Sequence, residues 1–194
     1  MVGMIRRAVI MVSVLLYALG ALPPGAARAE PSSALDDLVD AAAQRLQTAD
    51  AVAASKWLTG GPITDPARVQ QVLAAVTAEA QAAGVPPDYA AAVFTDQINA
   101  TEGVQYSRFS WWKFDPSTAP GSAPDLAASR SVIDGLNHEM VAQIGRQWPV
   151  LQSPDCAAAL SAAKNTVADA RGLDALYRQA LDAATRSYCR GWPG

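Results

Sequence analysis

Two cationic side chains, Arg45 and Lys56, stand eleven residues apart in a stretch rich in alanine and other apolar residues. At about 100° per residue, an α-helix brings them to within roughly 20° of the same face, about 16 Å apart along its axis. Because apolar residues surround that face, a buried and unpaired charge there would cost several kcal/mol. Few acidic residues lie beside them, so the spacing predicts that an anionic ligand binds both cations.

Three further groups of polar residues recur at helical spacing. Asp65 and Arg68 are three residues apart, Thr101 and Gln105 are four apart, and Arg130 follows a proline-rich stretch. Each has a simpler interpretation, because the first pair can be an exposed ion pair worth a few tenths of a kcal/mol. Thr101 and Gln105 can be solvated, and Arg130 can be an exposed residue at the start of a helix. Periodicity alone leaves these alternatives open.

The first 29 residues have the pattern of an export signal. Two arginines precede the apolar run 8–22, and the alanines at 27 and 29 form an A-x-A cleavage site. The alternative is a membrane anchor, but fifteen residues are fewer than the ~20 that a transmembrane helix needs. We therefore expect a cleaved signal peptide over 1–29, one domain over 30–194, and a secreted or periplasmic protein.

The charge balance excludes several classes of partner. Without the expected leader, 12 basic residues face 18 acidic ones. An acidic chain binds nucleic acid and anionic membranes poorly, so any cationic site must be local and suits a small anion. We expect neither a nucleic-acid partner nor a membrane partner after cleavage of the leader.

Cys156 and Cys189 are the two cysteines of the chain, and His138 is its one histidine. In an oxidising compartment a disulfide between the cysteines is favoured over two free thiols or a catalytic Cys–His pair. A single histidine without clustered ligands also argues against a transition-metal site. The sequence therefore predicts a disulfide scaffold and no metal.

The pattern of apolar residues and helix-ending signals predicts an all-α chain, with no sustained alternation typical of strands. We expect a single helical-bundle domain of about six helices, with a surface loop or lid over 115–125. The expected helices cover 33–57, 65–84, 88–113, 126–147, a short segment from about 154, and 173–188.

The chain resembles the exported all-helical chorismate mutases of the γ subclass, of mycobacterial type. The resemblance covers essentially the whole chain after the leader. It rests on the segments 38–46, 56–57, 94–102, 106–110 and 125–130 and on Cys189. The spacing from Arg45 through Lys56 to Asp65 and Arg68 also fits the family pattern.

The resemblance implies the Claisen rearrangement of chorismate, a dicarboxylate, to prephenate. Arg45 and Arg130 look like the arginines that bind the carboxylates, with Arg68 as a further cationic contact. Guanidinium groups suit this role because they bind carboxylates through two parallel hydrogen bonds. Asp65 and Thr101 look like residues that place the substrate's hydroxyl and carboxylate groups.

Lys56 and Gln105 look like donors to the ether oxygen of the breaking bond. Relatives can carry glutamate at position 105, which must be protonated to donate, whereas Gln105 is always a neutral donor. Val72 stands where relatives can have a polar contact. The resemblance also implies no cofactor, because a pericyclic step needs none, and a homodimer with each site inside one protomer.

Two alternatives use the same residues differently. One is an exported, non-catalytic helical protein that binds an aromatic-pathway carboxylic acid without converting it. The arginines would serve both functions, whereas the pair of donors formed by Lys56 and Gln105 favours the enzyme. The other alternative is a purely structural helical domain, in which replacing Arg45 or Lys56 leaves ligand binding unchanged.

Overall fold

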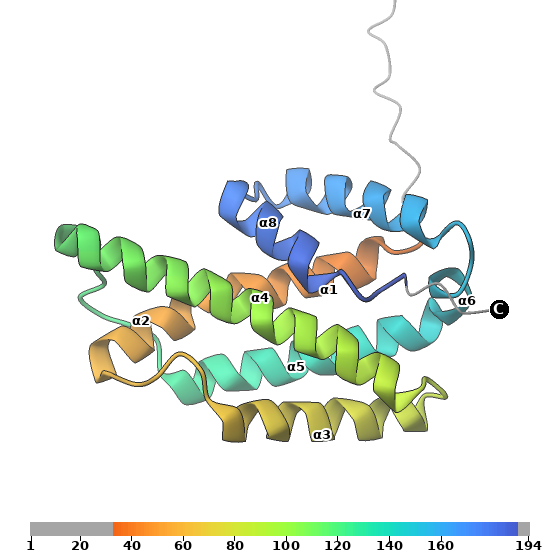
Figure 1. Ribbon diagram of the computed structural model, residues 1–194, viewed down its shortest axis with the longest axis horizontal. Helices are drawn as coiled ribbons and strands as arrows, with labels where there is room; N and C mark the ends of the chain where they lie inside the picture. Colours follow the sequence, from red (N-terminus) through yellow and green to blue (C-terminus); the bar gives the residue numbers. More distant parts are fainter. Residues whose placement is uncertain (1–32, 190–194) are drawn as a thin grey trace, which may run out of the picture. The chain divides into compact units, whose positions relative to one another are not determined.

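A computed structural model describes residues 33–189, and this range is helical without a strand (Figure 1). This confirms the predicted all-α class. The elements are α1 (Asp36–Gln47), α2 (Ala49–Thr59), α3 (Pro66–Ala82), α4 (Pro87–Phe114), η1, a short 3₁₀-helix (Pro116–Thr118), α5 (Leu126–Arg146), α6 (Trp148–Leu151), α7 (Cys156–Ala170) and α8 (Ala175–Ala184). The leader and its cleavage site lie outside the described residues.

Local capping signals set several of these boundaries. Asp65 is the N-cap of α3, and its Oδ1 accepts a hydrogen bond from the backbone N–H of Arg68 at 3.1 Å. Asp125 caps α5 in the same way, with two backbone N–H groups of the first turn as donors. Gly84 follows α3 with a φ of +76°, a left-handed conformation that glycine adopts without strain. These ends agree with the prediction.

One expected helix is divided in the structure, so that prediction is wrong. The expected helix over 33–57 divides at Thr48, whose hydroxyl and N–H both donate to the carbonyl of Arg45, at 2.7 and 3.2 Å. This tight turn separates α1 from α2, because a threonine hydroxyl competes for helix carbonyls. The expected helix over 126–147 is confirmed, since α5 ends at Arg146. The four-residue α6 that follows, with Pro149 in its first turn, where proline is tolerated, was not predicted.

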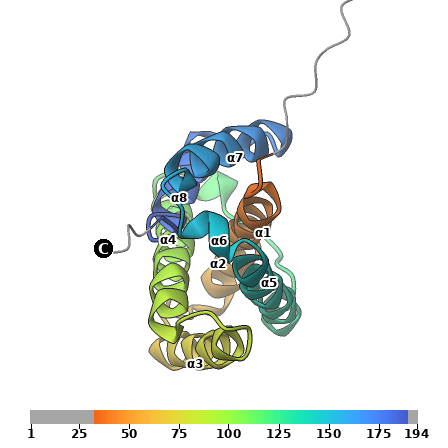
Figure 2. The same cartoon turned by 90° about the vertical axis from the view of Figure 1, so that its right-hand side faces the viewer.

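Helix α4 is the longest element and contacts α2, α3 and α8 (Figure 1). Both views place α7 and α8 on one side of the bundle and α3 on the opposite side, and Figure 2 shows α4 facing α1 and α5. The main core fills the space between these helices and includes Leu38, Leu46, Phe94, Met140 and Leu181, all fully buried. Within the described range no helix is long and apolar enough to cross a membrane.

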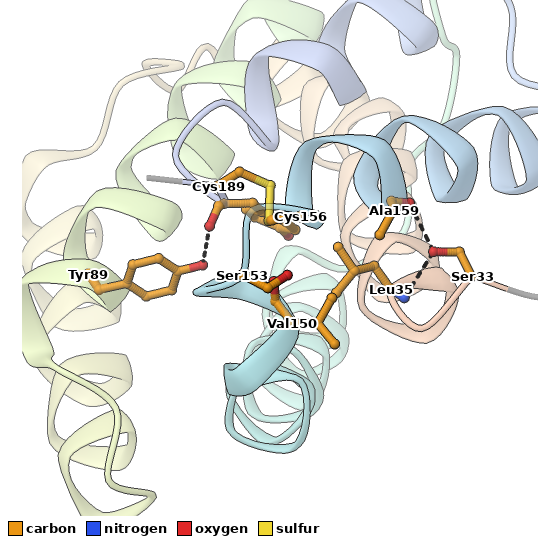
Figure 3. The surroundings of a disulfide bond; sticks show 9 residues. Ser33, Leu35, Tyr89, Val150, Ser153, Cys156, Ala159 and Cys189 are labelled. Atoms are coloured by element: carbon orange, nitrogen blue, oxygen red, sulfur yellow. Dashed lines mark hydrogen bonds between the residues drawn. A yellow bond between two sulfur atoms is a disulfide. The ribbon is translucent and has the colours of Figure 1, made fainter. Parts of the chain in front are cut away.

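The predicted disulfide is confirmed. Cys156 at the start of α7 and Cys189 after α8 are bonded, with Cα atoms 5.6 Å apart (Figure 3). Next to it, the hydroxyl of Tyr89 donates to the backbone carbonyl of Tyr188 at 2.8 Å. The bond and this contact attach the end of the chain to α7 and α4.

Replacing both Cys156 and Cys189 by serine is expected to lower the free energy of unfolding by about 3–4 kcal/mol, because the open loop regains entropy in the unfolded chain. Urea unfolding of the oxidised protein and of the double variant measures the difference. Reductant should destabilise the wild type and leave the variant unchanged. Equal stability of the two proteins would contradict the prediction.

Candidate active site

One pocket gathers all seven residues that the sequence singled out for substrate binding. They come from five different helices or their flanking turns, α1 to α5. The pocket is lined by Arg45, Val52, Lys56, Ile63, Asp65, Arg68, Val69, Val72, Ile98, Thr101, Glu102, Gln105, Leu126, Arg130 and Ile133. The structure thus brings the predicted residues together, while their individual roles remain predictions.

Arg45, in the last turn of α1, is a buried cation held by neutral groups. Its Nε donates to Oδ1 of Asn137 at 2.7 Å, and its Nη1 donates to Oγ1 of Thr101 at 3.1 Å and to the carbonyl of Gln97 at 3.4 Å. Burial, and then the neighbouring charge of Arg68, lower the pKa of Arg45 to about 10. The group is still charged at neutral pH, and an anion in the pocket would stabilise it.

Lys56, in the last turn of α2, is 9% exposed, and its Nζ donates to the backbone carbonyl of Ile63 at 2.5 Å. Burial lowers the pKa of this ammonium group, while the charges of Glu102 and Asp65 oppose the shift. No carboxylate among the described residues lies within ion-pair distance of it. Lys56 therefore presents a desolvated positive charge to the pocket.

Asp65 and Arg68 do not form the intrahelical ion pair that their spacing allowed. The second carboxylate oxygen of Asp65 instead accepts from Nη2 of Arg130 at 2.9 Å. The guanidinium of Arg68 binds Asp134 of α5, and its Nη1 donates to Oε1 of Gln71 at 2.9 Å. Both pairs cross from α3 to α5, so they join the two walls of the pocket.

Thr101 and Gln105 follow each other by one turn on α4, and both are buried, at 7% and 3% exposed. The hydroxyl of Thr101 donates to the carbonyl of Gln97 at 2.7 Å and accepts from Arg45. Oε1 of Gln105 is buried without a hydrogen-bond partner among the described residues. A buried amide of this kind is available to a polar ligand, and the solvated interpretation of the pair is wrong.

The remaining wall of the pocket is apolar. Val72 is 4% exposed and lies there with Ile98 and Ile133, so position 72 offers packing and no hydrogen bond. Its neighbour Gln71 accepts from Arg68. A lining of cations together with such apolar side chains suits a small anionic ligand with an apolar part.

Sequence reasoning missed two residues around the pocket. Glu102, which none of the spacing arguments included, lines the pocket, and its Oε2 accepts from the hydroxyl of Thr64 at 3.0 Å. The one feature of the sequence that could have indicated Glu102 is its position directly after Thr101. Asn137 could not be found from the sequence, because no local spacing connects it to Arg45, 92 residues away.

Among the described residues, no cluster of histidine, cysteine and carboxylate side chains could hold a metal.

The comparisons with known proteins agree with this geometry. Residues 34–106 match the family model described as chorismate mutase type II. The chain is 55% identical to the secreted chorismate mutase of Mycolicibacterium smegmatis, over 93% of this chain and 99% of that protein. It is 49% identical to that of Mycobacterium tuberculosis, over 95% and 92%.

The comparison with solved structures also finds a chorismate mutase. The crystal structure of the chorismate mutase from Burkholderia phymatum is 35% identical and superposes with a TM-score of 0.77, over 81% of this chain and 96% of that chain. The pocket described above therefore lies in a fold that solved chorismate mutases share. This chain belongs to the chorismate mutase family.

Proposed function

We propose that this protein is a chorismate mutase that converts chorismate to prephenate. The observation that carries the proposal is the convergence of four cationic side chains and one buried amide on a single pocket with an apolar wall. These groups are Arg45, Lys56, Arg68, Arg130 and Gln105. Chorismate requires such a set, because it has two carboxylates on a compact carbon skeleton and an ether bond that breaks during the reaction.

In this proposal the arginines bind the substrate and hold its reactive shape. Arg45 and Arg130 bind the two carboxylates, and Arg68 adds a third cation. Asp65, which accepts from Arg130, orients that guanidinium, and Thr101 does the same for Arg45. Fixing a compact conformer of the substrate lowers the entropic part of the barrier before any bond changes.

The second part of catalysis is electrostatic. Negative charge develops on the ether oxygen as its bond to carbon breaks, and we expect the ammonium of Lys56 and the amide N–H of Gln105 to donate to it. Because Lys56 is desolvated, its charge acts in a region of low dielectric, where it stabilises the transition state more than it would in water. The rearrangement is unimolecular, so these donors need no nucleophile, general base or cofactor beside them.

The direct test uses the purified protein from residue 30 onward. Chorismate absorbance should decrease on addition of the protein, and NMR should identify prephenate as the product. Calorimetry with chorismate separates the alternative, since a binding protein would give heat of binding with no product. Binding without turnover would reject the enzyme and support that alternative.

Replacing Gln105 by glutamate is expected to make catalysis pH-dependent. The wild type should keep a flat kcat/KM from mildly acidic to neutral pH, because an amide donates at every pH. The glutamate variant should lose activity as the pH rises through its carboxyl pKa, since only the protonated acid donates. Gln179→Glu, an exposed change on α8, is the control and should stay flat. Matching profiles for wild type and Gln105→Glu would contradict the role of Gln105.

We also propose that the protein is exported and forms a homodimer. The pattern of residues 1–29 and the secreted relatives support export. Sequencing of the N-terminus of the protein collected outside the cytoplasm should begin at Glu30. Light scattering after size-exclusion chromatography should give twice the mass of the mature chain, and a monomer that retains full activity would reject the dimer.

A further inference from the structure

Two side chains of α5 connect the guanidinium groups of Arg45 and Arg68. Asp134 and Asn137 are three residues apart, so they lie on the same face of the helix. Oδ1 of Asn137 accepts from Nε of Arg45 at 2.7 Å, and its Nδ2 donates to Oδ1 of Asp134 at 3.5 Å. The same oxygen of Asp134 accepts from Nη2 of Arg68. A continuous chain of hydrogen bonds thus joins two cations of the pocket.

The contacts of Arg45 fix the direction of its guanidinium group. Asn137 of α5 holds Nε on one side, and Thr101 of α4 holds Nη1 on the other. No hydrogen bond to Nη2 occurs among the described residues. Two anchored nitrogens on different helices leave the plane of the group little freedom, and Nη2 is the nitrogen that remains available to donate to a ligand carboxylate.

The side chain at position 137 is a neutral amide, and this determines its effect on the charge of Arg45. Asn137 is 5% exposed and does not line the pocket, so it has no contact of its own with a ligand there. Its amide oxygen accepts from Arg45 without neutralising the positive charge. A carboxylate at this position would pair with Arg45 and compete with the substrate. The amide therefore orients the cation and leaves its charge available.

We propose that Asn137, braced by Asp134, is a positioning residue that sets the orientation of Arg45 for the substrate carboxylate. The inference rests on the proposed function, because it assigns Arg45 an anionic substrate. Asp134 accepts a hydrogen bond from the guanidinium of Arg68 and another from the amide of Asn137, which in turn holds Arg45. These contacts keep the guanidinium groups of Arg45 and Arg68 at a fixed separation before substrate binds. Such preorganisation removes the cost of ordering these long side chains during the reaction.

The first test is a double-mutant cycle between Asn137 and Arg45. Asn137→Ala should lower kcat/KM by about 10- to 100-fold, since a misplaced binding group can cost about 100-fold. If Asn137 acts only through Arg45, adding Asn137→Ala to Arg45→Ala should cause no further loss. Multiplicative losses, or an unchanged kcat/KM in Asn137→Ala, would overturn the proposal.

A second variant guards against a folding defect. Asn137→Asp keeps the shape of the side chain and introduces a carboxylate beside Arg45. We expect its KM to rise more than its kcat falls, because the new charge competes with the substrate carboxylate. Equal KM values for this variant and the wild type would count against the proposal.

The matched control is Gln143→Ala. Gln143 is also a buried amide of α5, at 6% exposed, and its Oε1 accepts from Nε of Arg146 at 3.4 Å, away from the pocket. This variant should lose stability to a similar degree and keep its kcat/KM. A loss of kcat/KM in Gln143→Ala as large as in Asn137→Ala would show a general effect of α5 and overturn the proposal.

A readout independent of turnover separates this inference from the proposed function. The Nε–H group of Arg45 should give a slowly exchanging proton–nitrogen NMR signal, assigned by its loss in Arg45→Lys. The signal should exchange faster in Asn137→Ala and remain slow in Gln143→Ala. If the wild type fails to convert chorismate, the proposed function falls and this measurement still tests the inference. An unchanged signal in Asn137→Ala would reject it.

Discussion

Replacing Lys56 by alanine is expected to lower kcat by about 10²- to 10³-fold, the effect typical of removing one donor to a developing negative charge. KM should change much less, because this charge appears only in the transition state and not in bound chorismate. Steady-state kinetics on chorismate measure both constants. A raised KM with an unchanged kcat would mean that Lys56 only binds the substrate, and would contradict the role assigned to it.

The pH dependence of the wild type provides a control for this prediction. Burial lowers the pKa of the Lys56 ammonium below its ordinary value of 10.5, so kcat/KM, which reports the pKa values of the free enzyme, should fall as the pH rises through the lowered pKa. Lys56→Ala should lose the part of the alkaline decline that the ammonium group causes and keep the part near pH 10 that belongs to Arg45. Lys113→Ala removes an exposed lysine from the end of α4 and should keep the wild-type kcat and the decline.

Replacing Arg45 by methionine is expected to lower kcat/KM by about 30- to 5,000-fold, which corresponds to the 2–5 kcal/mol typical of truncating a buried charge contact. The thermal unfolding midpoint should change by only a few degrees. Removal of a desolvated cation favours folding, and this gain offsets the loss of its hydrogen bonds to Asn137 and Thr101. Kinetics and calorimetric melting of the same preparation measure the two effects.

Arg171→Met is the matched control for Arg45. Arg171 makes a two-pronged ion pair with Asp40, away from the pocket, with the Nη2–Oδ2 distance at 2.6 Å. Its loss should reduce stability modestly and leave kcat/KM unchanged. A large stability loss in Arg45→Met with an unchanged kcat/KM in the molecules that remain folded would identify Arg45 as a structural residue instead.

Most helix ends could be predicted because their signals are local. Asp65 with Pro66 at the start of α3, and Gly84 after its end, act within one turn of chain. The division at Thr48 could not be predicted in the same way. A threonine inside a helix either faces solvent or bonds to a preceding carbonyl, and packing around the residue selects between these states.

The candidate site was also only partly predictable from the sequence. Helical spacing indicated Arg45 and Lys56, and both line the pocket, but the break at Thr48 puts them on two helices and not on one face of a single helix. The resemblance added the other five predicted residues of the pocket. Neither source indicated the partners of these cations. Asn137 holds Arg45, Asp134 holds Arg68, and the carbonyl of Ile63 holds Lys56. The first acceptor is a buried amide, the second an exposed carboxylate and the third a backbone carbonyl, so the three contacts share no sequence signature.

The sequence by itself determined the all-α class, most helix boundaries, the disulfide, and which residue types could bind a small dicarboxylate. These properties depend on interactions within a few residues, or on side-chain chemistry that needs no geometry. Only the tertiary structure decided how the cations are held, because hydrogen bonds and desolvation act between segments that the fold brings together. The orientation of Arg45 by Asn137, 92 residues away, is of that second kind.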